Sequence, residues 1–322
     1  MNEVLTQNGI SRREMLRMLG GGALMVGAAG LLAGCAGTDV AGPRSVQDYT
    51  MYVSTFFGTT VERYQAGTGK NLGTFVGGLQ RSNGLAFGPD GDLYVVATIG
   101  NSVTRYDVKT RQVKGTLTGF YTPHTLVFGP DGNLYVPNAP TFPRQDIPQP
   151  TGQDNIQRFN GVTGAPMGTF AFVDTPFAMG FGPDGDLYVS TVVEFGNTIP
   201  KSDYITRFDG KTGASKGKFI TGLKHPYSII WDKDGNMLLP QYFLGQIKKF
   251  DGKTGQEIGT VAEVANPIGI TIGPHGALYC GTFSDAAGSP NSGSVERFTL
   301  PSGTHTGAVV SGLPFVSYVA FG

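Results

Sequence analysis

The feature that most constrains the fold is a nine-residue motif that recurs along the chain. It is FGPDGDLYV at 87–95, FGPDGNLYV at 128–136 and FGPDGDLYV again at 181–189, with weaker copies at 230–239 and 272–280. Successive copies begin 41 to 53 residues apart. Short apolar segments around a glycine-containing turn, repeated at this period, are typical of the blades of a β-propeller.

A second repeated segment follows each copy and has the pattern hydrophobic, any residue, basic, aromatic. It occurs six times, at 61–64, 103–106, 156–159, 205–208, 247–250 and 295–298. A tight turn such as DGKTG (209–213) and a further short apolar segment come next. Alternating apolar residues bounded by Gly, Asp and Pro favour half-buried strands. Each unit therefore predicts four strands, which we call a, b, c and d from the axis outward.

The two ends of the repeat region complete the sixth unit. Residues 51–53 match strand b without a strand a before them, and residues 319–322 match strand a without a strand b after them. Pairing the first and last segments in one sheet removes the open edge of a ring. We expect an all-β fold over residues 49–322: a six-bladed β-propeller of four-stranded blades, closed by a composite blade of N- and C-terminal strands.

The Pro-Asp-Gly turn between strands a and b has a simple conformational explanation. Proline presets φ, aspartate bonds to nearby backbone, and glycine accepts a positive φ. Asp90, Asp131 and Asp184 are therefore interpreted as turn residues, and no EF-hand-like spacing supports the alternative of calcium ligands.

Strand a also has two rows of different size. The row expected to pack between blades is large: Leu85, Leu126, Met179, Ile229, Ile270 and Val319. The alternate row, expected to face the axis, is mostly small: Gly84, Thr125, Ala178, Ser228, Gly269 and Tyr318. Six inner strands that crowd one axis favour small side chains there.

Residues 1–35 are predicted to be an export signal and are set apart from the fold. Arg12 and Arg13 lie in SRREMLR (11–17), which resembles a twin-arginine motif, and LAGC (32–35) resembles a bacterial lipobox that would place lipid on Cys35. The alternative is a single N-terminal membrane helix, but the apolar run is short and rich in Gly and Ala. Residues 36–48 are interpreted as a tether, so the protein is expected to be exported and lipid-anchored at the cell surface or the periplasmic face of the membrane.

Composition excludes some partners. The formal net charge is zero and 15% of residues are charged, so no basic surface for nucleic acid is expected. Of the two cysteines, acylation would consume Cys35 and leave Cys280 alone on a predicted strand, where a lone cysteine is usually a small buried hydrophobe. We expect a monomer.

The motif GPDGxLYV followed by the hydrophobic–x–basic–aromatic strand resembles the NHL-repeat and streptogramin-lyase-like six-bladed propellers. The resemblance covers residues 49–322 and implies the fold; the wider group includes binding scaffolds, a C–O lyase and metal-dependent lactonases. This chain has LYVVA, LYVPN and LYVST where streptogramin lyases typically have LWFTE. It also has no counterpart of the metal-binding glutamate of the gluconolactonase-type group. Catalytic residues are therefore not transferred from the family.

The longest loops are predicted to share one face of the propeller. The segments between strands b and c are expanded at 135–158, 188–207 and 279–297, relative to 94–105. These b–c loops lie on the same face as the d–a loops, and we call it the loop face; the opposite face is the turn face. Elaborated loops on a rigid scaffold are where binding usually resides.

The candidate site residues cluster on the loop face. His124, His225 and Glu194 are the candidates for metal ligation or acid/base catalysis, with a divalent metal ion as the implied cofactor. The alternative is two loop histidines that bond only to backbone or water. Candidate ligand-binding residues are Asn83, Asn138, Thr191, Phe177, Tyr227, Gln241 and Asn266.

Two functions from different classes follow, and a purely structural spacer remains a third. The first is a tethered propeller that binds a small molecule, glycan or peptide through the loop face and channel mouth, because aromatic residues are frequent in these loops and charges are few. The second is a metal-dependent lyase or hydrolase at the same place. The aromatic residues could instead pack the loops themselves.

Overall fold

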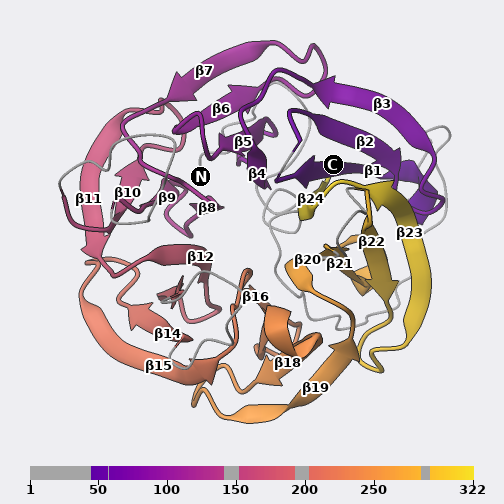
Figure 1. Ribbon diagram of the computed structural model, residues 1–322. Coiled ribbons are helices and arrows are strands. Elements are labelled where there is room, and N and C mark those ends of the chain that lie inside the picture. The colour runs from indigo at the N-terminus through magenta and orange to yellow at the C-terminus, as the bar shows by residue number, and fades with distance from the viewer. Residues whose placement is uncertain (1–44, 57, 141–151, 193–202, 284–290) are drawn as a thin grey trace, which may run out of the picture.

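The computed structural model describes residues 45–56, 58–140, 152–192, 203–283 and 291–322. These residues form six four-stranded antiparallel sheets, arranged as blades around a central axis (Figure 1). The predicted all-β, six-bladed architecture is confirmed. Arg12, Arg13, Cys35 and Glu194 lie outside the described residues. Within the described residues, no helix is long and apolar enough to span a membrane.

Five blades are continuous in sequence. Blade 1 comprises β4 (Ser82–Phe87), β5 (Leu93–Ala97), β6 (Ser102–Tyr106) and β7 (Val113–Leu117). Blade 2 comprises β8 (Val127–Phe128), β9 (Leu134–Asn138), β10 (Asn155–Phe159) and β11 (Pro166–Phe172). Blade 3 comprises β12 (Pro176–Phe181), β13 (Leu187–Thr191), β14 (Asp203–Phe208) and β15 (Ser215–Leu223). Blade 4 comprises β16 (Ile230–Trp231), β17 (Met237–Gln241), β18 (Gln246–Phe250) and β19 (Glu257–Glu263). Blade 5 comprises β20 (Pro267–Ile272), β21 (Leu278–Thr282), β22 (Gly293–Phe298) and β23 (His305–Leu313).

The sixth blade joins the two ends of the chain. The C-terminal strand β24 (Val316–Phe321) pairs with β1 (Thr50–Thr55), which is followed by β2 (Val61–Gln65) and β3 (Asn71–Val76). Met51 lies opposite Phe321 and Val53 opposite Val319. This is the predicted composite blade, and it closes the ring by joining the two ends of the repeat region in one sheet. Three short 3-10 segments complete the described structure, at Val46–Asp48, Tyr242–Leu244 and Pro274–Gly276.

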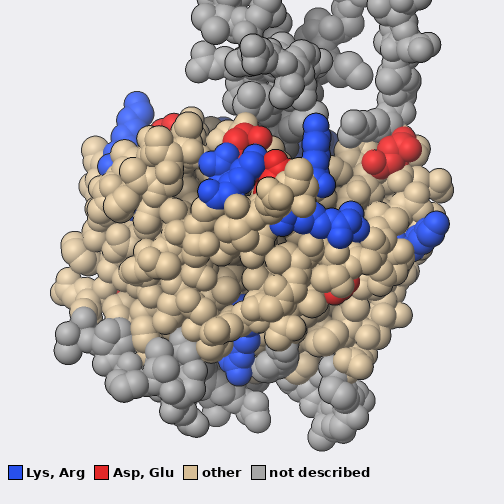
Figure 2. Space-filling view, turned by 90° about the horizontal axis from the view of Figure 1, so that it is seen from above, with Lys and Arg blue, Asp and Glu red and all other residues tan. Residues whose placement is uncertain are grey.

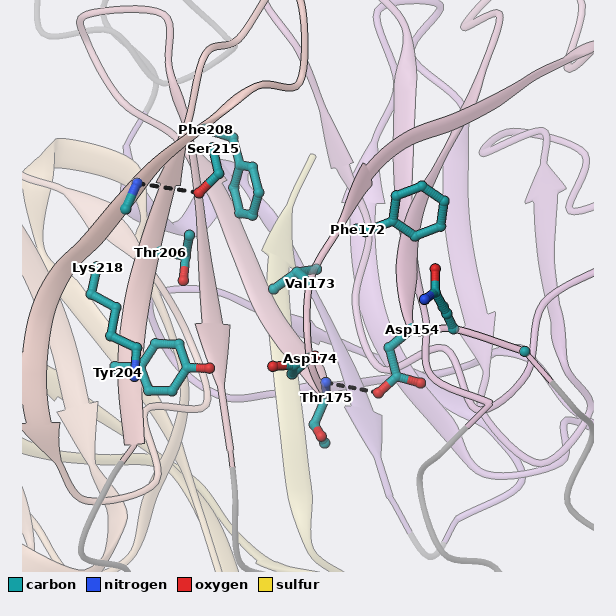
Figure 3. A pocket seen from close by; sticks show the side chains of 13 residues that line it. Asp154, Phe172, Val173, Asp174, Thr175, Tyr204, Thr206, Phe208, Ser215 and Lys218 are labelled. Carbon is teal, nitrogen blue, oxygen red and sulfur yellow. Dashed lines mark hydrogen bonds between the residues drawn. The ribbon is translucent and has the colours of Figure 1, made fainter.

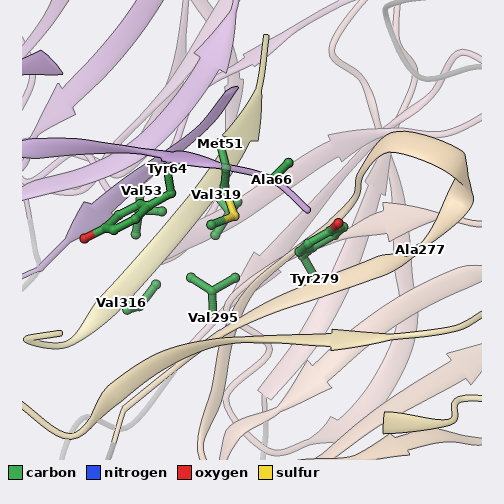
Figure 4. Close-up of a cluster of buried hydrophobic side chains, with 9 residues drawn as sticks. All are labelled: Met51, Val53, Tyr64, Ala66, Ala277, Tyr279, Val295, Val316 and Val319. Atoms are coloured by element: carbon green, nitrogen blue, oxygen red, sulfur yellow. The ribbon is translucent and has the colours of Figure 1, made fainter. Parts of the chain in front are cut away.

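The hydrophobic core is divided among the blade interfaces. Six buried clusters occur, each built from residues of two neighbouring blades. Figure 4 shows the one between the composite blade and blade 5, where Met51 and Val319 face Tyr279 and Val295. The predicted large row of strand a lies in these interfaces, and its six members are all buried. Cys280 is also buried there, as predicted, and is a free cysteine.

The Pro-Asp-Gly turns have the predicted structural role and a second one. Asp131 Oδ1 accepts a hydrogen bond from the amide of Asn133 at 3.1 Å, and its Oδ2 accepts one from the hydroxyl of Tyr135 at 2.9 Å. The glycine that precedes the proline is required by packing: a Cβ on Gly129 would lie 2.7 Å from the ring of Tyr135 and 3.1 Å from that of Phe181 in the next blade. The motif therefore forms the turn and seals the interface between blades.

Charged residues are concentrated around these turns. Arg105 on β6 contacts Asp90 and Asp92, each at 2.6 Å, and Arg207 on β14 makes the equivalent pairs in blade 3. In Figure 2, Lys, Arg, Asp and Glu gather along one rim of the visible face, and the wall below is mostly uncharged. These ion pairs, with that of Lys249 and Asp232 at 2.8 Å, explain the basic residue at the third position of the repeated strand in blades 1, 3 and 4.

Candidate functional site

The d–a corners of the loop face are held by a repeated hydrogen bond. In three consecutive blades, an Asn or Asp at the start of strand c or one residue before it accepts the backbone N–H of a residue at the corner: Asn101 from Thr122 (3.0 Å), Asp154 from Thr175 (2.8 Å) and Asp203 from His225 (2.8 Å). Each of these donors has a positive φ, between 40° and 52°. Non-glycine residues adopt that conformation only when the surroundings impose it. These bonds therefore set where the corner residues lie.

Three residues predicted to bind ligand also hold the corners. Asn138 Oδ1 accepts the amide of Tyr121 at 2.6 Å, Gln241 Oε1 accepts the amide of Lys224 at 2.8 Å, and Thr191 Oγ1 donates to the carbonyl of Asp174 at 2.8 Å. Each bond joins the end of strand b to the equivalent residue of the preceding d–a loop. These groups position the loops, and their role in ligand binding stays a prediction.

Four other predicted residues come together at the axis. Asn83, His124, Phe177 and Tyr227 occupy the same repeat position in blades 1 to 4, four residues before the last aromatic residue of strand a. Asn83 Nδ2 lies 3.4 Å from His124 Nδ1. The His124 ring stacks on Phe177 with centroids 4.0 Å apart, and Phe177 contacts Tyr227 at 4.8 Å. We call this contact run, from Asn83 to Tyr227, the inner arc.

His225 and Asn266 do not occupy this repeat position. They precede it by two residues, at the left-handed corners of blades 4 and 5, with φ of 52° and 48°. His225 extends the inner arc because its ring stacks on Tyr227 at 5.4 Å. Asn266 instead accepts the amide of Phe283 at its carbonyl (3.4 Å). Each of the two residues is followed by a proline, Pro226 or Pro267. This pattern indicates the corner in the sequence but not the direction in which the side chain points.

The two histidines are thus separated, within this run of contacts, by the rings of Phe177 and Tyr227. Among the described residues, no group of three or more His, Cys, Asp and Glu is placed to hold a metal ion. Glu194, the predicted third ligand, lies outside the described residues. The described donors alone therefore do not fit a zinc site, which takes at least three protein ligands.

Burial keeps His124 neutral. Its side chain is 2% exposed, and desolvation lowers its pKa to about 3. In the neutral tautomer that carries its proton on Nε2, Nδ1 accepts a hydrogen bond from the side-chain amide of Asn83. The inner arc is consequently an uncharged surface that combines aromatic faces with an amide and an imidazole at neutral pH.

Tyr318, which was not among the predicted site residues, reaches this region from the composite blade. Its hydroxyl donates to the carbonyl of Tyr227 at 2.9 Å, which joins the composite blade to blade 4. Burial raises the pKa of Tyr318 to about 12, although its side chain stays partly exposed. A signal was present in the sequence, since Tyr318 is the one bulky member of the otherwise small row of strand a.

A groove also lies farther from the axis, between blades 2 and 3, and it was not predicted. Its volume is about 610 Å³, and Figure 3 shows Phe172 on one side, Tyr204 and Lys218 on the other, and Val173 and Asp174 between them. Asp154 and Asp174 lie toward its loop-face end, and Phe172 also borders a neighbouring hollow of about 480 Å³. The available signal was that Phe172 and Tyr204 depart from the repeat.

No protein-family model and no curated protein matches the sequence. Among solved structures, the chain resembles the gluconolactonase XC5397 of Xanthomonas campestris, with a TM-score of 0.61 and 20% identity over 72% of this chain and 78% of the gluconolactonase. It resembles a chain of a nidogen/laminin complex, with a TM-score of 0.63 and 12% identity over 85% of this chain and 98% of that one. A protein of unknown function from Bacteroides caccae gives a TM-score of 0.65 and 10% identity, with the same coverage of 85% and 98%. At these identities the likenesses show the fold, a six-bladed β-propeller, and leave function to be argued from the site.

Proposed function

We propose that this protein is an exported, lipid-anchored β-propeller of the NHL-repeat and streptogramin-lyase-like kind that binds a small molecule, glycan or peptide through its loop face. The observation that carries the proposal is the inner arc. Four consecutive blades place chemically different side chains (Asn83, His124, Phe177 and Tyr227) at one repeat position, in contact with one another beside the axis.

The chemistry of the arc favours binding of a neutral or amphipathic ligand. Tyr227 and Tyr318 are partly exposed, whereas Asn83 and His124 are buried. Aromatic side chains supply large apolar contact area, and a few placed polar groups orient a ligand. The interlocked d–a corners keep these groups in position before a ligand arrives, which lowers the entropic cost of binding.

The test is a binding screen of the purified protein against a glycan array, a peptide library and a set of lactones and cyclic esters. We expect at least one class to bind and Tyr227→Ala to weaken that binding at least about tenfold. Val162→Ala is the matched control, since Val162 is 75% exposed in a strand c–d turn on the opposite face. Binding that Tyr227→Ala and Asn83→Ala leave unchanged would place the site elsewhere.

The anchoring part of the proposal has its own test. Cys35→Ser is expected to move the protein from the membrane fraction to the soluble fraction and to abolish labelling with a fatty-acid probe. Replacing Arg12 and Arg13 by lysine is expected to hold the protein inside the cell. Cys280→Ala, which changes a buried cysteine without a disulfide, is the control and should alter neither result.

A metal-dependent lyase or hydrolase is the second candidate, favoured by the two histidines at opposite ends of the same aromatic run. A neutral imidazole, as burial makes His124, is the form that ligates metals. Elemental analysis of protein purified without chelator or affinity histidines tests this candidate. Near-stoichiometric zinc, calcium or manganese that is absent from the His124→Ala/His225→Ala double variant would support this candidate. A metal-free protein whose stability does not change when divalent ions are added would count against it.

A further inference from the structure

The groove between blades 2 and 3 departs from the repeat at three positions at once. Each outer strand contains a glycine beside a shift in pairing register, which is Gly168 in β11 and which we call the glycine bulge. Phe172 is the fourth residue after it, where the other blades have Gly77, Gly119, Thr221, Glu263 and Ser311. Tyr204 precedes the buried residue of strand c, where the others have Thr60, Ser102, Asn155, Gln246 and Ser294. Lys218 follows the bulge, where the others have Thr74, Thr116, Thr169, Thr260 and Ala308.

These three departures converge on one space although they come from different blades. Phe172 ends β11 of blade 2, whereas Tyr204 lies on β14 and Lys218 on β15 of blade 3. All three border the same groove, on opposite walls (Figure 3). The repeat itself does not need an aromatic or a basic residue there, because the other blades have neither at these positions. The substitutions therefore build a local surface feature rather than the propeller.

The groove offers an aromatic face that the protein leaves open. Phe172 is 63% exposed, the largest exposed fraction among the aromatic side chains of the described residues. Tyr204 is held in place by Lys218, whose Nζ lies 3.7 Å from the centre of the tyrosine ring. Covering an exposed aromatic ring with a ligand removes apolar surface from water, so a ring that is exposed within a groove is suited to ligand contact.

Hydrogen-bonding groups surround the aromatic rings, and two of them are not used by the described part of the fold; the Ser215 hydroxyl accepts the amide of Gly217 at 3.2 Å. The carboxylate of Asp174 and the hydroxyl of Tyr204 make no hydrogen bond within the described part of the chain. Asp174 is exposed beside Val173, on the groove floor. Thr206 and Ser215 add hydroxyls on the blade 3 wall, and Lys218 adds an ammonium group. Acceptors and donors thus both line a groove of about 610 Å³, within the range of small-ligand sites.

We propose that this groove is a second binding site, separate from the inner arc, and that its ligand is an oligosaccharide without acidic groups. A pyranose ring has an apolar C–H face that packs on an aromatic ring and a rim of hydroxyls that donate to carboxylates and accept from an ammonium group. Two carboxylates, Asp154 and Asp174, against one ammonium disfavour an anionic ligand. The mixture of donors and acceptors suits hydroxyl groups better than a simple cation.

The test is titration of the purified protein with cellotriose, maltotriose and N,N′,N″-triacetylchitotriose, followed by calorimetry and by saturation transfer from protein to sugar protons. We expect one of them to bind with a dissociation constant at or below the millimolar range, typical of weak but specific small ligands. Phe172→Ala should weaken binding at least about tenfold, and Phe172→Tyr, which keeps the ring, should stay within about threefold of wild type. Tyr204→Ala should also weaken it.

Controls separate this site from the other surfaces. Ile258→Ala removes an apolar side chain that is 55% exposed on the outer strand β19, and it should leave sugar binding unchanged. Sugar binding that Tyr227→Ala abolishes and Phe172→Ala leaves intact would place the sugar in the inner arc and overturn the inference, so failure here is distinct from failure of the proposed function. The inference is overturned if none of the three sugars binds at about 10 mM, or if Phe172→Ala leaves their binding intact. Binding of trilysine that Phe172→Ala abolishes, with no sugar binding, would overturn it in favour of a basic peptide.

Discussion

The carboxylate of Asp203 accepts the backbone N–H of His225 at 2.8 Å, and this bond holds His225 at a φ of 52° on the loop face. Asp203 is the first residue of β14, and His225 lies two residues after the end of β15, the outer strand of blade 3. Asp203 is fully buried, so its carboxylate depends on partners of this kind. The position of a candidate functional side chain is thus set by a carboxylate that is itself a scaffold residue.

Replacing Asp203 tests that relationship. Asp203→Ala leaves the buried amide of His225 without this acceptor and is expected to lower the free energy of unfolding by about 1 to 3 kcal/mol. Asp203→Asn should cost less, because blade 1 already uses an amide, that of Asn101, for the same bond to Thr122. Urea denaturation measures both. Asp234→Ala, at an exposed turn aspartate, is the control, and equal losses in the Asp203 and Asp234 variants would contradict the explanation.

Gly129 should not tolerate a side chain. The Cβ of Gly129→Ala would lie 2.7 Å from the ring of Tyr135, so that ring or the one from the next blade must move. Overpacking of this kind typically costs about 1 to 3 kcal/mol. Gly115→Ala is a matched control, since a Cβ there meets nothing within 4 Å and its φ is ordinary. The midpoint of thermal unfolding should be clearly lower for Gly129→Ala than for Gly115→Ala. Similar midpoints would show that the close approach of the two rings does not exclude a side chain at Gly129.

The buried imidazole of His124 predicts a dependence of stability on pH. Burial lowers its pKa to about 3, whereas histidine in an unfolded chain titrates near ~6.5. Below about pH 6.5 the unfolded chain therefore binds a proton that the folded chain does not, and stability falls as the pH decreases toward the folded pKa. Urea unfolding between about pH 7 and pH 4.5 should show a shallower decline for His124→Asn than for wild type. Blade 1 has Asn83 at this position, so the change is conservative; parallel declines would refute the prediction.

Blade 5 lacks a hydrogen bond that blades 1 to 3 share, and the bond can be restored. In blade 3, Asp184 bonds to Tyr188 at 2.9 Å, but blade 5 has His275 at this turn position with a φ of 60°. Within the described structure, the buried hydroxyl of Tyr279 and the Nε of Arg297 have no hydrogen-bond partner. His275→Asp supplies a carboxylate for the hydroxyl of Tyr279 and for Nη2 of Arg297, as Asp184 does for Tyr188 and for Nη2 of Arg207. It is expected to raise the free energy of unfolding by about 1 to 2 kcal/mol.

A double-mutant cycle checks the mechanism of that gain. In a Tyr279→Phe background, His275→Asp should stabilise the protein less, because one of the two donors is gone. Thermal unfolding of the four proteins gives the coupling between the two positions. An equal gain in both backgrounds would show that the gain comes only from removing a histidine with a positive φ.

Much of the fold was predictable because the repeat encodes it locally. The turn at Asp131, the alternation of strand a and the pairing of residues 51–53 with 319–321 depend on neighbours in sequence or on the rule that a ring must close. The structure confirms each of them, down to Met51 opposite Phe321. Local conformational preferences and the two-residue period of a strand act in the same way in every blade, so a single sequence suffices to predict them.

The site was predictable only in part, because it forms between blades. The sequence placed His124, His225 and Asn138 on one face, but tertiary packing decided that His124 stacks on Phe177 and that Asn138 binds the amide of Tyr121. The same holds for the groove, where Phe172 and Tyr204 meet across a blade interface. By itself the sequence determined the repeat, the number of blades and their closure, which follow from local periodicity. Only the tertiary structure decided which side chains meet, because those contacts depend on the lateral packing of segments about 50 residues apart, which has no local pattern.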